Sequence, residues 1–73
     1  MEQMKYLVLE IQTSADGEVS TIVTQKDILN EAMSAFYMVL AAAAVSSVPL
    51  HAAVLMMNNG AVIKSEMFDH SEV

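Results

Sequence analysis

The chain has 73 residues, of which 55% are hydrophobic and only 16% are charged, and its formal net charge is −6. A chain of this length forms one domain and buries only about 60% of the surface that its unfolded form exposes. We therefore expect a single domain over 1–73, with an ordered core of about 5–69. The absence of cysteine excludes disulfides and thiolate metal sites, and three scattered lysines do not make the basic cluster that direct nucleic-acid binding needs.

Residues 6–13, YLVLEIQT, alternate in the manner of a strand and are followed by SADGEV, a typical turn sequence. A two-residue loop would pair Leu9 with Thr24, whereas a three-residue loop with a left-handed Gly17 would pair Leu9 with Val23. We favour the three-residue loop because it places Val19 and Val23 on the face of the strand leucines, which we expect to be the core face.

The segment from Thr24 to Ser47 has helical periodicity, and Asp27 is its expected N-cap. Thr24 with Asp27 three residues later is an alternative capping arrangement. The expected core stripe of this helix consists of Ile28, Ala32, Ala35, Phe36, Val39 and Ala43.

The opposite surface of the helix begins polar, at Asn30 and Ser34, and then becomes apolar. A helix that is apolar all round is buried all round, and one small sheet cannot cover both sides. We therefore predict a homo-oligomer, although alanine is also simply the best helix former. The predicted interface consists of Met33, Tyr37, Met38, Ala41, Ala44 and Val45 on the helix and of Leu55, Met57 and Val62 after it.

Val48-Pro49 ends the helix, and LHAAVLMMNNGAVIKSEMF then predicts a hairpin with a type I′ turn at Asn59-Gly60. That two-residue loop pairs Met57 with Val62 and Leu55 with Lys64. The expected core face of this hairpin consists of Ala52, Val54, Met56, Ile63, Ser65 and Met67. The predicted fold is α+β, in the order β-β-α-β-β, with two antiparallel hairpins packed on one central helix.

No Cys nucleophile, Gly-rich phosphate loop or histidine pair at helical spacing is found, so we predict neither an enzyme nor a bound cofactor or metal. His51 and His70 could approach each other on one strand face and form a weak metal site. Lys64 could bind a small anionic ligand, or it could simply pair with Glu66 or be solvated. His51 and Lys64 are therefore weak candidates for ligand binding.

The apolar run over residues 35–57 is long enough to span a membrane. Val48-Pro49 interrupts it, and no basic cluster flanks it to set an orientation. The acidic N-terminus does not fit a signal peptide. We expect a cytoplasmic protein that does not insert into membranes.

The segments YLVLEIQTSADGEVSTIVT, YMVLAAAAVSSVPLHAAVL and NNGAVIKSE together resemble a group of short, uncharacterised proteins of Gram-positive anaerobes and of their phages and mobile elements. The resemblance covers about Tyr6 to His70, and residues 27–38 are more apolar here than in that group. It implies a non-enzymatic binding module, such as an inhibitor of host defence that sequesters a small ligand or blocks a host protein. The alternative is a structural or assembly protein whose function is self-association.

Overall fold

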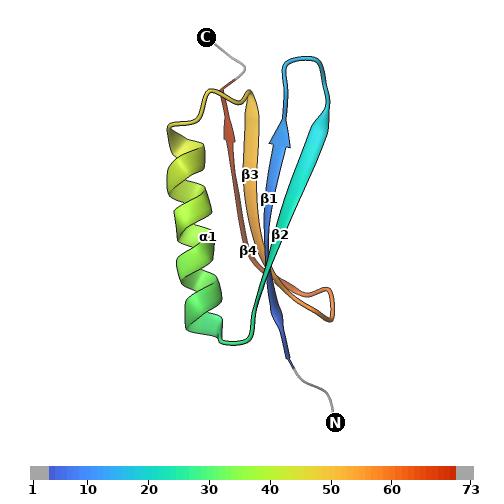
Figure 1. Cartoon of the computed structure of the whole chain (residues 1–73), viewed down its shortest axis with the longest axis vertical. Coiled ribbons are helices and arrows are strands. Elements are labelled where there is room, and N and C mark those ends of the chain that lie inside the picture. Colours follow the sequence, from blue (N-terminus) through green and yellow to red (C-terminus); the bar gives the residue numbers. More distant parts are fainter. Residues whose placement is uncertain (1–3, 71–73) are drawn as a thin grey trace.

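The computed structural model describes residues 4–70 and contains one helix and four strands (Figure 1). The strands are β1 (Tyr6–Thr13), β2 (Val19–Lys26), β3 (Leu50–Met57) and β4 (Val62–Asp69), and the helix is α1 (Leu29–Ala44). All strand pairs are antiparallel, and the sheet has the order β2-β1-β3-β4. The predicted β-β-α-β-β order of a small α+β fold is confirmed, and the β1–β3 pairing joins the two hairpins into one sheet.

The first hairpin has the three-residue loop that we expected. Leu9 lies opposite Val23, the Ser14 N–H donates to the Glu18 carbonyl at 2.8 Å, and Gly17 has a φ of +91°. Within the loop, the Ser14 hydroxyl and the Glu18 N–H both donate to the Asp16 carboxylate. These hydrogen bonds hold the pKa of Asp16 below its ordinary value of 3.8, and the bond from the Ser14 hydroxyl has the larger effect.

The turn of the second hairpin differs from the prediction. A type I′ turn needs a positive φ at both central residues, but among residues 4–70 only Gly17 and Gly60 have one. Gly60, with a φ of +97°, instead ends a three-residue loop, and the Met57 N–H donates to the Ala61 carbonyl at 2.8 Å. The pairing of Leu55 with Lys64 is confirmed, whereas the pairing of Met57 with Val62 is wrong, because a register shift after Leu55 places Val62 opposite Met56.

The N-terminus of α1 also differs from the prediction. Ile28 is the N-cap, in an extended conformation and without a side-chain capping bond. Asp27 precedes this N-cap by one residue, and its carboxylate lies 2.8 Å from the Nζ atom of Lys5, in an ion pair. Of the residues predicted to form the core stripe of the helix, Ala32, Phe36 and Ala43 are buried, whereas Ile28 is 55% exposed.

The helix covers the face of the sheet opposite to the predicted core face. Its core partners are Val8, Ala53 and Leu55, whereas the predicted core residues of the strands lie on the uncovered side, apart from Ile63, which falls in the register shift between Val62 and Lys64. β2 and β3 run parallel with β1 between them, so residues 27–49 form a crossover connection. Such connections have a strongly preferred right hand, and the hand selects the face on which the helix lies. The alternation pattern favoured the other face, because the covered face also carries the polar side chains of Glu10, Gln12 and His51.

Candidate functional site

The uncovered face of the sheet is the most extensive apolar surface that the strand register defines. Opposite residues in an antiparallel pair share a face, which assigns to it Leu7, Leu9, Ile11, Val19, Val23, Leu50, Ala52, Val54, Met56, Val62 and Met67. We call this surface the open face. The other side chains assigned to it are Thr13, Thr21, Gln25, Ser65 and Asp69, so its one charge lies near the end of an edge strand.

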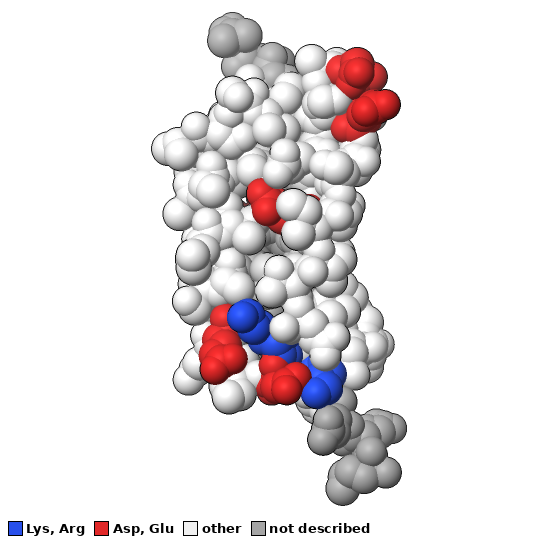
Figure 2. Space-filling model, in the orientation of Figure 1, with Lys and Arg blue, Asp and Glu red and all other residues white. Residues whose placement is uncertain are grey.

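Exposure within the open face follows position in the sheet. On the edge strands Val23, Val62 and Met67 are each more than half exposed. On the central strands the side chains of Leu9 and Val54 are half-buried by their neighbours alone. Soluble monomers rarely expose an apolar surface that crosses a whole sheet. Figure 2, a view that includes α1 along its left side, shows charged side chains mainly toward the two ends of the molecule and an acidic group near its middle.

The outer surface of α1 is a second apolar surface. Tyr37, Met38 and Val45 are 47%, 71% and 86% exposed, and Ala41 and Ala44 are exposed beside them. These five residues, which we call the helix surface, lie where the sequence predicts an interface.

The other predicted interface residues are divided among three environments. Met33 packs partly against the core, and Met57 is half-buried. Val62 is 58% exposed and belongs to the open face. Leu55 is fully buried beneath α1, so its side chain cannot contact a partner and its assignment to an interface is wrong.

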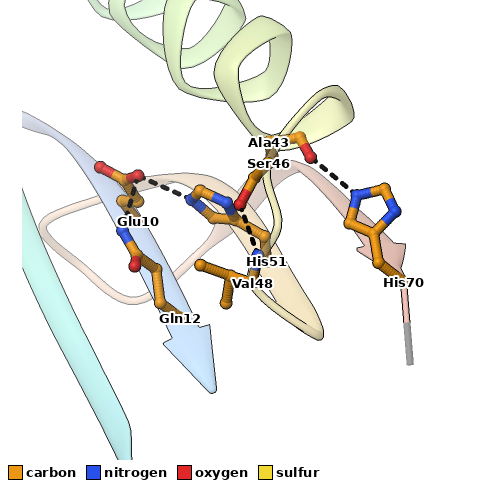
Figure 3. Close-up of polar contacts among 7 residues, drawn as sticks. All are labelled: Glu10, Gln12, Ala43, Ser46, Val48, His51 and His70. Atoms are coloured by element: carbon orange, nitrogen blue, oxygen red, sulfur yellow. Dashed lines mark hydrogen bonds and ion pairs between the residues drawn. The ribbon is translucent and has the colours of Figure 1, made fainter. Parts of the chain in front are cut away.

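The helix-covered face carries a buried polar cluster that the sequence did not reveal. The Glu10 carboxylate accepts a hydrogen bond from His51 Nε2 at 2.7 Å and another from Gln12 Nε2 at 3.0 Å (Figure 3). His51 is only 4% exposed, and its Nδ1 atom has no hydrogen-bond partner within the described chain. Gln12 lies opposite His51 in the β1–β3 register, and that long-range pairing brings Glu10 to the imidazole.

His51 and His70 do not form the metal site that their spacing would allow. The Nε2 atom of His70 donates to the Ala43 carbonyl at 3.0 Å and so satisfies an acceptor at the end of α1 (Figure 3). His51 points instead to Glu10. No group of three histidine and carboxylate side chains that could hold a metal ion occurs within residues 4–70.

The hollows of the surface are shallow. Two of them, with volumes of about 290 and 460 Å³, share Ser14, Ala15 and Pro49 as a common wall. Lys64 lies at a third, of about 160 Å³, between α1 and β4 with Tyr37 and Glu66. Within the described chain Lys64 forms no ion pair, so the alternative in which it pairs with Glu66 is not observed. Of the two weak ligand-binding candidates, Lys64 is therefore accessible and His51 is enclosed.

Comparison of the chain with protein-family models, with curated proteins and with solved structures found no significant match. The resemblance to proteins of phages and mobile elements therefore stays a prediction. The apolar run over residues 35–57 is divided between the end of α1 and β3, and no helix in residues 4–70 has the length and apolar character needed to cross a membrane.

Proposed function

We propose that the protein is a non-enzymatic, self-associating binding module in which two copies pack open face against open face. The observation that carries this proposal is the open face itself, which spans all four strands and has a single charge near one edge. Two sheets packed in this way lie about 10 Å apart and interdigitate their side chains, as in a β-sandwich.

The size of the open face suits such a contact. Four strands of eight residues cover about 26 Å by about 19 Å, at about 3.3 Å per residue and about 4.8 Å per strand. Two such faces have a combined flat area of about 1,000 Å², and the side chains that project from them add to it. This area reaches the lower limit for a specific protein–protein interface.

A second copy is the best-supported occupant because the monomer has a small core. Within residues 4–70 only six hydrophobic residues are fully buried, and three of them are alanines: Ala32, Ala43 and Ala53. Small domains with such cores are commonly stabilised by oligomerisation. If the fold needs its open face covered in order to be stable, the covering molecule must be present when the chain folds. A second copy of the same chain meets this requirement without any other partner.

Packing through the open face leaves the helix surface on the outside of the dimer. Each copy would then present Tyr37, Met38 and Val45, all exposed, to a further partner. This arrangement assigns the self-contact to the sheet and the binding of another molecule to the helix. The predicted role of the helix surface in self-association is the competing arrangement.

The two surfaces are distinguished by native mass spectrometry of matched charge variants. Val54→Lys and the milder Met67→Lys place a charge on the open face, and Ala41→Glu places one on the helix surface. We expect the wild-type protein and Ala41→Glu to be oligomers of the same mass, and both open-face variants to be smaller. Circular dichroism separates dissociation from unfolding. A monomeric wild-type protein, or dissociation by Ala41→Glu alone, would refute the open-face contact.

A further inference from the structure

The two edges of the sheet differ in how they are protected against pairing with another strand. β4 contains Lys64 and Glu66 within the strand and a register shift near its start, and charges and irregularities of this kind prevent edge pairing. β2 has none of these features before its last residue, Lys26. It pairs with β1 over all eight residues without a register shift.

The sequence of β2 is suited to pairing. Residues 19–24, VSTIVT, are mostly β-branched and uncharged, which favours a strand. Ile22 and Val23 are 55% and 57% exposed, on opposite faces of the sheet. A long, regular and apolar edge strand is a template for another strand.

The hydrogen bonds of the first hairpin establish which backbone groups of β2 are free. The Glu18 carbonyl faces β1, since it accepts the Ser14 N–H at 2.8 Å. Backbone direction alternates along a strand, so residues 20, 22, 24 and 26 also bond to β1. Residues 19, 21, 23 and 25 therefore direct their N–H and C=O groups outward, toward an added strand.

Two antiparallel self-pairings of β2 give the greatest overlap while keeping side chains on matching faces. One places Ile22 opposite its own copy, and the other places Val23 opposite its own copy. Only the Ile22-centred register sets Glu18 of each copy opposite Lys26 of the other. It also sets Ser20 opposite Thr24, a favourable cross-strand pair.

The charges at the ends of β2 are available for such contacts. Within the described chain the ion pairs are Lys5 with Asp27 and Glu10 with His51, so neither Glu18 nor Lys26 has an ion-pair partner there. In the Ile22-centred register Glu18 and Lys26 would each gain an ion-pair partner in the other copy, with the uncharged residues of β2 between the two contacts. In the Val23-centred register Lys26 would lie opposite Ser20 and gain none.

We infer that β2 pairs with β2 of a second copy, antiparallel and centred on Ile22, with the two Glu18–Lys26 contacts fixing the register. The product is a continuous eight-stranded sheet whose two helices lie on one side and whose open faces join on the other. This extends the proposed self-association but uses a different surface, so either contact can fail without the other.

Cysteine cross-linking tests the inference, since the chain has no native cysteine. In the Ile22-centred register, Ile22→Cys places two thiols on a non-hydrogen-bonded pair with Cα atoms about 4.5 Å apart, which a disulfide can bridge. Ser20→Cys is the matched control, because its two copies would lie about 13 Å apart, four residues along the strand. Ser20→Cys mixed with Thr24→Cys should form the mixed disulfide.

We expect mild oxidation to convert most of the Ile22→Cys protein, and little of the Ser20→Cys protein, to a covalent dimer. Glu18→Lys should reduce cross-linking at position 22, and Glu18→Lys with Lys26→Glu should restore it. Cross-linking of Val23→Cys in place of Ile22→Cys would overturn the register, and no cross-linking at any of these positions would overturn the strand pairing. The cross-link should persist in Val54→Lys, which disrupts the open face, and its loss there would refute an independent edge contact.

Discussion

The imidazole of His51 lies almost fully enclosed between α1 and the sheet, and Glu10 is its one described hydrogen-bond partner. A carboxylate only accepts hydrogen bonds, so the proton of this contact is on Nε2. Buried polar groups are costly when they lose their partners. Glu10 is therefore needed to hold His51 in the fold, and only the carboxylate side of the pair is partly exposed, at 21%.

Replacing Glu10 with Ala should destabilise the fold by about 1–3 kcal/mol, because His51 is then buried with neither nitrogen partnered. Urea unfolding at one fixed protein concentration measures this loss. Gln12→Ala is the control, since it removes a donor to Glu10 but leaves the contact with His51 in place. The double variant Glu10→Leu/His51→Leu should lose less stability than the sum of the losses of Glu10→Leu and His51→Leu. An unchanged stability of Glu10→Ala would contradict a structural role for the pair.

At the scale of the elements, the turn between β3 and β4 depends on one residue with a positive φ. Gly60 takes that conformation, and nothing lies within 4 Å of the position that a Cβ atom would occupy there. Asn59 has no positive φ, and its side chain accepts a hydrogen bond from the Ala61 N–H at 3.0 Å. The turn therefore requires glycine at position 60 for conformational reasons and benefits from asparagine at position 59 through one hydrogen bond.

Gly60→Ala should cost about 1–2 kcal/mol, because a residue with a Cβ atom is strained in the left-handed region. Asn59→Ala should cost about 1 kcal/mol or less, the usual contribution of one exposed hydrogen bond. Thermal or urea unfolding of the two variants gives the comparison. A type I′ turn would instead make the two positions nearly equal in sensitivity, so equal losses would argue against the three-residue loop.

The molecule as a whole has an elongated shape, with extents of 48 × 20 × 15 Å and little interior. Its helix covers one side of the sheet, and within residues 4–70 of a single copy nothing covers the other side (Figure 1). When folding and association are coupled, mass action makes stability depend on protein concentration.

The Tm of the wild-type protein should therefore rise when its concentration is raised about a hundredfold, because association stabilises only the folded chain. Differential scanning calorimetry at the two concentrations makes the measurement. Val54→Lys, which places a charge on the open face, should have a lower Tm that changes less with concentration, because only the edge contact of β2 would remain. A wild-type Tm that is equal at both concentrations would indicate that the monomer is stable with its open face uncovered.

The elements were predictable from local sequence. Alternation over residues 6–13 determines a strand, and a glycine at position 17 with apolar residues at 19 and 23 determines the register of the first hairpin. The second turn was located correctly but assigned the wrong type, since a loop at Asn59-Gly60 can place either one or two residues at positive φ. Local chain geometry decides these features, so a short stretch of sequence contains most of the information.

Which face of the sheet α1 covers was decided only by the tertiary structure. Leu9 and Val54 looked like core residues and lie on the open face, while Val8 and Leu55 form the core. Glu10, Gln12 and His51 give the covered face the pattern of a solvent face, so polarity pointed to the wrong side. The face that the helix covers depends instead on the hand of the connection between β2 and β3. The Glu10–His51 contact likewise depends on the β1–β3 register, which joins residues 41 positions apart in sequence. Interactions of this range follow from how the elements pack, because no local pattern distinguishes one long-range register from another.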